Sequence, residues 1–126
     1  MKFTATPDTL SEILEWLEEE LKSRSSESLL LACEEAIVNI VHHGYGDLPG
    51  FLDISINKKD SEVHVVMIDT APAFNPLEKE APVDPSLPLE KRHEGGLGII
   101  LMKKYTDALF YERVNGKNIL TLVKKI

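Results

Sequence analysis

Cysteine is nearly absent from this 126-residue sequence, since Cys33 is the only one. It lies among apolar neighbours, so we expect a small buried side chain and no disulfide. The single cysteine and four histidines show no zinc-type spacing, and we predict no structural metal. No apolar run is long enough to cross a membrane, and the N-terminus does not resemble a signal peptide, so we expect a cytoplasmic protein without membrane contact.

The sequence also lacks an excess of basic residues. It has 14 Lys and Arg against 21 Asp and Glu, a formal net charge of −7. Nucleic-acid binding needs a basic surface, so direct binding to nucleic acid is not expected. The negative charge is compatible with binding to a basic or neutral protein partner. The content of 43% hydrophobic and 28% charged residues is typical of a globular chain, and its length fits one domain over residues 1–126.

Hydrophobic spacing predicts an α+β fold. We expect a two-layer sandwich whose mainly antiparallel, mixed sheet is covered on one face by about three helices. Asn115 and Gly116 predict a tight hairpin turn, and residues 58–61 predict another. The expected helices are 7–22, about 26–43 and a short one from 99, and the expected strands are 1–6, 51–57, 62–69, 108–114 and 117–124.

The segment from about 70 to 94 differs in composition from the rest of the chain. Five of the seven prolines lie in it, among Ala, Asp, Glu and Lys. A stretch of this length without predicted secondary structure is usually functional or disordered. We therefore treat it as a candidate lid over a site.

Three polar residues interrupt the apolar pattern of the second predicted helix. Glu35, Asn39 and His43 follow one another at i, i+4 and i+8, so they are expected on one helix face. A solvated stripe is the simple interpretation. A carboxylate and an amide on one rigid face also suit phosphate chemistry, because Asn39 is a hard oxygen ligand for magnesium and Glu35 could take a proton from an attacking hydroxyl or water.

Two further segments carry candidate chemistry. The glycine-rich turn 95–98 leads into a helix, where free N–H groups and the helix dipole suit phosphate oxygens; a flexible lid end is the alternative. Asp69 ends an apolar strand, where it could begin a turn or accept a hydrogen bond from an exocyclic amine such as that of adenine.

These three segments together resemble the asparagine box and the two glycine boxes of the GHKL ATPase superfamily. They are E-A-I-V-N-I-V-H-H-G at 35–44, D-T-A-P-A-F-N-P-L at 69–77 and G-G-L-G-I-I-L-M at 95–102. Within the superfamily, the chain most resembles the small anti-sigma-factor serine kinases. The resemblance implies a histidine-kinase-like ATPase domain of the Bergerat type, with residues 70–94 as the ATP lid.

The resemblance also implies roles for individual residues. Glu35 would be the general base, Asn39 would hold Mg²⁺ in the ATP site, and Asp69 would recognise the adenine amine. His43 would lie near the nucleotide or simply end its helix, and Arg92 and His93 would approach the terminal phosphate or remain solvated. The other residues implied in nucleotide binding are Ala71, Phe74, Gly95, Gly96, Leu97 and Gly98.

One residue departs from the family pattern. The pattern after the strand aspartate is D-x-G-x-x-F, and Ala71 stands where the glycine would be. The added methyl resists positive φ and would push adenine aside if the backbone passes close to it. Nucleotide affinity is the property that this residue puts in question.

The resemblance implies an ATP- and Mg²⁺-dependent protein-serine kinase. Its substrate would be an anti-sigma-factor antagonist of the STAS type, a sigma factor is a second candidate partner, and a homodimer is typical of these kinases. The alternative is a non-catalytic module that senses nucleotide or sequesters a partner. A detached histidine-kinase catalytic domain is a third interpretation, which the absence of histidine from the first predicted helix disfavours.

Overall fold

A computed structural model of the chain describes residues 1–22, 27–73 and 96–126. Its sheet has five strands in the order β1-β2-β3-β5-β4, and every neighbouring pair is antiparallel. Phe74, Arg92, His93 and Gly95 lie outside the described residues. The strands are β1 (Lys2–Ala5), β2 (Gly50–Lys59), β3 (Glu62–Asp69), β4 (Ala108–Val114) and β5 (Lys117–Lys125).

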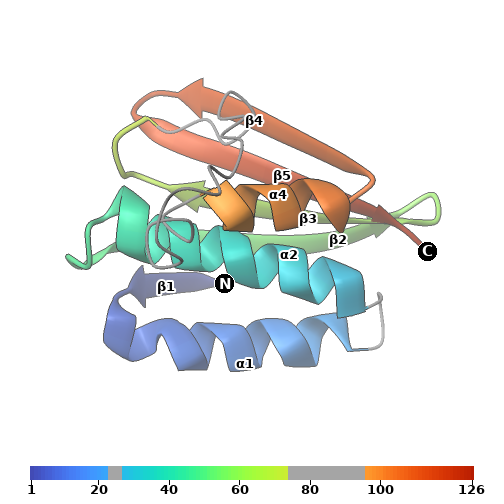
Figure 1. Cartoon of the computed structure of the whole chain (residues 1–126), viewed down its shortest axis with the longest axis horizontal. Helices are drawn as coiled ribbons and strands as arrows, with labels where there is room; N and C mark the ends of the chain where they lie inside the picture. The colour runs from blue at the N-terminus through green and yellow to red at the C-terminus, as the bar shows by residue number, and fades with distance from the viewer. Residues whose placement is uncertain (23–26, 74–95) are drawn as a thin grey trace, which may run out of the picture.

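The helices α1, α2 and α4 lie side by side over one face of this sheet (Figure 1). This arrangement confirms the predicted α+β fold with helices on one face of the sheet, but the sheet of the described residues is antiparallel throughout and not mixed. The helical segments are η1 (Pro7–Thr9), α1 (Leu10–Leu21), α2 (Glu27–Val38), η2 (Asn39–Gly44) and α4 (Gly96–Lys104). None of the described helices has the length and apolar character needed to cross a membrane.

Tight turns connect the strands of two hairpins, β2–β3 and β4–β5. Asp60 and Ser61 have φ of 49° and 66°, and Asn115 and Gly116 have φ of 49° and 76°. Positive φ at both central residues matches the right-handed twist of the strands. The first turn is shorter than the predicted 58–61, because β2 continues to Lys59.

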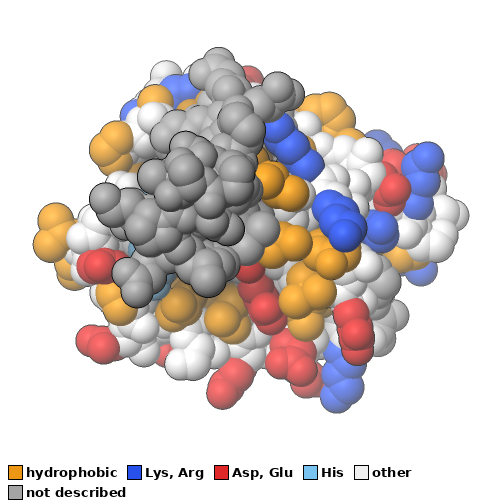
Figure 2. Space-filling view, viewed as in Figure 1, with side chains coloured by type: hydrophobic (Ala, Val, Ile, Leu, Met, Phe, Trp, Pro, Cys, Tyr) orange, Lys and Arg blue, Asp and Glu red, His pale blue; other side chains and the backbone are white. Residues whose placement is uncertain are grey.

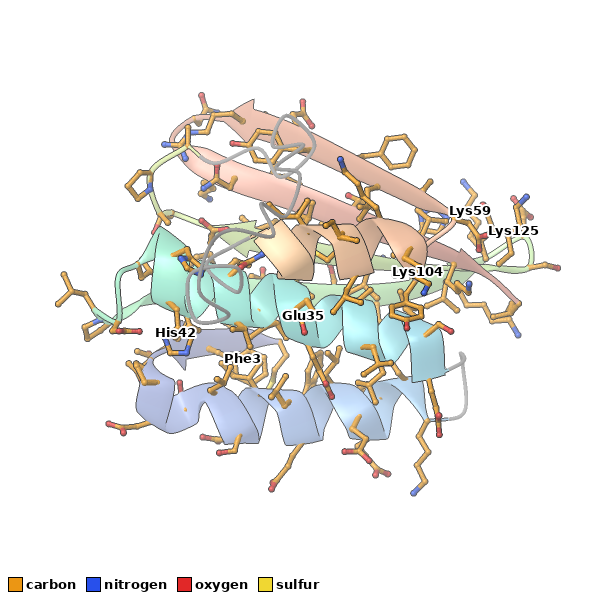
Figure 3. The ribbon with its side chains drawn as sticks, viewed as in Figure 1. Phe3, Glu35, His42, Lys59, Lys104 and Lys125 are labelled. Atoms are coloured by element: carbon orange, nitrogen blue, oxygen red, sulfur yellow. The ribbon has the colours of Figure 1, made fainter. Side chains whose placement is uncertain are left out.

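The core lies between the helices and the inward face of the sheet. Alternation along β3 buries Val63, Val65, Met67 and Asp69, so the last inward position of this strand is a carboxylate. Cys33 is fully buried, as expected, and burial raises the pKa of its thiol. At the sheet edge, Phe3 and Trp16 pack edge to face, with ring centroids 5.3 Å apart (Figure 3).

Two predicted helices differ in part from the structure. The second reaches its predicted end near His43, but α2 ends at Val38 and the wider π-helical turn η2 continues over Asn39–Gly44. The third helix begins at Gly96 rather than at 99, so two glycines lie in its first turn. Glycine is a poor helix former, and packing of α4 against α2 has overridden that preference. Both shifts occur where the two helices approach the end of β3.

Candidate functional site

Asp69 is a buried carboxylate at the end of β3. It is 5% exposed, and its Oδ1 accepts hydrogen bonds from the backbone N–H of Ala71 at 3.0 Å and from Nδ2 of Asn118 at 2.8 Å. Burial raises the pKa of Asp69, while the bonds from Asn118 and Ala71 and the charge of Arg113 act in the opposite direction. A carboxylate is thus kept inside the fold with one oxygen fixed by the protein itself.

Asn118 is a residue of this site that the sequence interpretation missed. It lies opposite Asp69 in the β3–β5 register and is 5% exposed. Its Nδ2 donates to Asp69 and to the carbonyl oxygens of Ala71 and Pro72, and its Oδ1 accepts from the hydroxyl of Tyr111. A signal for it was present, since Asn118 shares the inward face of its strand with Leu120 and Leu122.

The end of η2 is tied to the same strand end by Tyr45. The Tyr45 hydroxyl donates to the carbonyl of Phe51 and accepts from the backbone N–H of Thr70 at 2.8 Å. Its ring lies over Gly50, where a built Cβ would be 2.2 Å from the nearest ring atom. No side chain fits under this ring, so Gly50 lets Tyr45 hold η2 beside Asp69.

Glu35 and Asn39 meet the first turn of α4 at Gly98. A Cβ built on Gly98 would lie 2.9 Å from Oε2 of Glu35 and 3.6 and 3.7 Å from Nδ2 and Oδ1 of Asn39. Glu35 is half-buried in the last turn of α2, and Figure 3 labels it. Asn39 is 9% exposed, and its Nδ2 has no hydrogen-bond partner among the described residues. The absence of a side chain at 98 is what brings these three groups together.

One pocket connects Asn39 with Asp69. It is a small cavity of about 40 Å³ that is partly open to solvent, and most of its surface is apolar. Apolar walls with a few buried polar groups are typical of a site for a small organic ligand. The lining residues are Ala36, Asn39, Ile40, Gly44, Asp69, Ala71, Pro72, Met102, Tyr111, Asn118 and Leu120.

The structure brings some of the predicted site residues together and leaves others apart. Asn39, Asp69 and Ala71 line the pocket, and Gly98 lies beside it against Glu35. His43 is exposed and does not line the pocket. Gly96 and Leu97 belong to the first turn of α4, and nothing further is described of them.

The donor set fits a magnesium ion that is held mainly by its ligand. Asn39 is 9% exposed, and its amide oxygen is the atom that could bind Mg²⁺, while its unpartnered Nδ2 is a donor that could pair with an acceptor oxygen of a ligand. Among the described residues, no three His, Cys, Asp or Glu side chains are grouped to hold a metal ion. Magnesium commonly takes one or two protein oxygens and completes its shell with phosphates and water.

The sequence is similar to those of known protein kinases. A serine/threonine-protein kinase, BtrW, from Bordetella bronchiseptica is 29% identical over 128 residues, which cover 97% of this chain and 89% of the relative. A serine-protein kinase, RsbW, from Oceanobacillus iheyensis is 34% identical over 88 residues, 66% of this chain and 55% of the relative. The chain therefore matches little more than half the length of that RsbW.

A solved structure has the same fold. The RsbU and RsbW domains of Rv1364c from Mycobacterium tuberculosis superpose with a TM-score of 0.61 at 16% identity, over 99% of this chain and 32% of that one. The family of the histidine kinase-like ATPase domain matches residues 3–124. The family predicted from the three sequence motifs is thus confirmed, and this chain belongs to the histidine kinase-like ATPase domain family.

Proposed function

We propose that this chain is an ATP- and Mg²⁺-dependent protein-serine kinase of the anti-sigma-factor type. The observation that carries the proposal is the close approach of Gly98 to both Glu35 and Asn39. It brings a candidate base, a candidate metal ligand and the N-terminal turn of α4 to one place. Backbone N–H groups in the first turn of a helix suit phosphate oxygens. The site therefore has the groups needed at the phosphate end of ATP.

The other end of the pocket suits adenine. Asp69 Oδ1 is occupied by the protein, so its second oxygen is the one available to accept a hydrogen bond from an exocyclic amine. Ile40, Met102 and Leu120 supply apolar surface for the faces of a purine ring. With a base at Asp69, the phosphates would extend toward Asn39, which lines the same pocket.

The proposed reaction is transfer of the γ-phosphoryl group to a serine hydroxyl. Glu35 takes the hydroxyl proton, the serine oxygen forms a bond to the γ-phosphorus, and the bond from this phosphorus to the β,γ-bridging oxygen breaks, so that ADP leaves. Asn39 would hold Mg²⁺, which supplies positive charge to the phosphates when bound. Because Glu35 and Asn39 are one helical turn apart, the base and the metal ligand keep a fixed separation.

The proposed substrate is a STAS-type anti-sigma-factor antagonist, and a sigma factor is a second proposed partner. Support comes from the three motifs and from the protein-serine kinase names of the relatives. We also propose that the chain acts in the cytoplasm, forms a homodimer, and comprises a single domain with an ATP lid at about 70–94.

The proposal is tested by transfer of labelled phosphate from ATP to a STAS protein encoded nearby. We expect Mg²⁺-dependent phosphoserine on the STAS protein. The variant Asn39→Ala should bind Mg²⁺-ATP more weakly, because it loses the amide oxygen. Absence of transfer to every such candidate, despite measurable ATP binding, would contradict the kinase activity, and unchanged Mg²⁺-ATP affinity in Asn39→Ala would contradict the metal-ligand role.

The alternative is a non-catalytic module that senses nucleotide or sequesters a partner. It is favoured by Ala71, which lines the proposed nucleotide pocket where the family pattern has glycine. Calorimetry separates the two functions. A sequestering module would bind its partner with the same affinity in the presence and absence of ATP, and no phosphate would be transferred.

A further inference from the structure

We propose that Ala71 is a specificity-determining residue whose methyl group narrows the adenine end of the pocket and holds nucleotide affinity low. The inference rests on the proposed nucleotide binding and deepens it. The residue is 3% exposed and lines the pocket two positions after Asp69. Its methyl therefore occupies volume that a ligand bound at Asp69 would use.

The Ala71 methyl faces Gly44 at the end of η2. A Cβ built on Gly44 would lie 3.2 Å from this methyl, closer than an ordinary carbon–carbon contact of 3.5–4.0 Å. A side chain at residue 44 would therefore crowd Ala71, and both residues line the pocket. Removal of the Ala71 methyl would add space at this point.

The methyl cannot move aside, because both backbone groups of Ala71 are bonded. Its N–H donates to Asp69 Oδ1 at 3.0 Å. Its carbonyl accepts from Nη1 of Arg113 at 2.8 Å and from Nδ2 of Asn118 at 3.1 Å. The two donors come from β4 and β5, so the segment after β3 is fixed to two strands. Burial of Asn118 and its bond from Tyr111 make this anchor rigid.

The backbone conformation accepts alanine without strain. Among the described residues other than glycine, positive φ is found only at Asp47, Asp60, Ser61 and Asn115. Ala71 thus stays in a conformation open to any residue, and its effect on the pocket is one of volume alone. Replacement by glycine should enlarge the pocket while the three backbone hydrogen bonds remain.

The location of Ala71 separates its effect from that of the phosphate site. Ala71 is bonded to Asp69, whereas Glu35 and Gly98 meet beside Asn39. A wider pocket at residue 71 should therefore improve binding of the base and leave binding of the phosphates unchanged. Adenosine and inorganic tripolyphosphate serve as probes for the two ends.

The experiment is calorimetric titration of the wild type, Ala71→Gly and Ala71→Val with ATP, adenosine and tripolyphosphate. We expect Ala71→Gly to bind ATP and adenosine with a Kd about fivefold to tenfold lower, because relief of overpacking has this size. Ala71→Val should bind both more weakly, and tripolyphosphate should show the same affinity for all three proteins. Ala108→Gly, a half-buried alanine on β4 away from the pocket, is the matched control and should equal the wild type.

The outcomes are distinct. Equal affinity of the wild type and Ala71→Gly for adenosine would overturn the role of Ala71 and leave the proposed kinase intact. A gain of the same size for tripolyphosphate would also overturn it, because the effect would not belong to the base. If neither protein binds any nucleotide while both unfold cooperatively, the proposed function itself fails along with the inference. If Ala71→Val does not fold, the comparison of Ala71→Gly with the wild type is sufficient to test the role of Ala71.

Discussion

At the scale of single residues, Asp69 stands out because the protein keeps its charge inside the fold. A buried carboxylate costs free energy unless hydrogen bonds compensate it, and here Asn118 and the Ala71 N–H both donate to one oxygen. The pKa of Asp69 is still raised, since burial outweighs these bonds and the charge of Arg113. The residue therefore lowers the stability of the folded protein at neutral pH, as expected for a group retained for a ligand.

This raised pKa predicts a pH dependence of stability. Between the ordinary value of 3.8 and the raised one, the folded protein holds a proton that the unfolded chain has released. The free energy of unfolding should thus fall as pH rises through this window and then level off. Asp69→Asn removes the titration, and its Oδ1 can still accept both hydrogen bonds.

The measurement is urea unfolding of the wild type and Asp69→Asn from about pH 4 to about pH 7. The stability of the wild type relative to the variant should decrease with rising pH. A relative stability that is constant or rises with pH would show that the Asp69 carboxylate is not destabilised by its burial.

Some residues of the candidate site could be predicted from the sequence and others could not. The sequence pointed to Asn39 because it interrupts an apolar helix pattern and to Asp69 because it ends an apolar strand, and both line the pocket. Asn118 interrupts the inward face of β5 in the same way, but its meaning depends on a pairing with Asp69 across 49 residues. Strand register is set by packing and turn geometry, so this partner became clear only in the folded structure.

At the scale of elements, the site depends on where α2 and α4 begin and end. The change from α2 to the π-helical turn η2 occurs at Asn39, and such turns are frequent at functional sites. Periodicity predicted an α-helix through this point, because apolar Ile40 and Val41 are buried in either geometry. The early start of α4 was also not predicted from the sequence. Glycine has a low helix propensity, so the pattern placed the helix after the glycines, whereas tertiary packing stabilises a helix that includes them.

The contact at Gly98 predicts a specific effect of Gly98→Ala. The new methyl would stand 2.9 Å from Glu35 Oε2, the mobile end of a side chain, so the carboxylate should rotate away. Alanine is the better helix former, so stability should be retained. Because the proposed base is displaced, we expect phosphate transfer to slow by at least about tenfold while the Kd for ATP stays within a few-fold.

Single-turnover transfer and ATP titration of Gly98→Ala check this prediction, with thermal unfolding as the control for folding. A transfer rate equal to that of the wild type would show that the space at residue 98 is not needed by Glu35.

At the scale of the whole molecule, the fold brings three segments that are distant in sequence together at one site. The end of β3 brings Asp69 beside β5, and the helix layer brings α4 against α2 (Figure 1). The fold class was predictable, because alternation and helical spacing are local patterns. The pocket was not, because its shape depends on how these layers meet.

Charge is also organised at this scale. Acidic side chains gather along the side of the helix layer formed by α1, whereas basic side chains lie toward α4 (Figure 2). Glu34 belongs to the acidic side: burial raises its pKa, as do the charges of Glu18 and Glu35. It is adjacent to Glu35 in sequence but points about 100° away around the helix. Glu34 is therefore the natural control for Glu35.

The measurement that tests the central claim most directly is single-turnover phosphate transfer by the wild type, Glu35→Gln and Glu34→Gln. We predict that Glu35→Gln loses transfer by at least about 100-fold, because it removes the base, and keeps its ATP affinity within a few-fold. Glu34→Gln should transfer phosphate at the wild-type rate. Wild-type transfer by Glu35→Gln would contradict the assignment of Glu35 as the base of a protein-serine kinase.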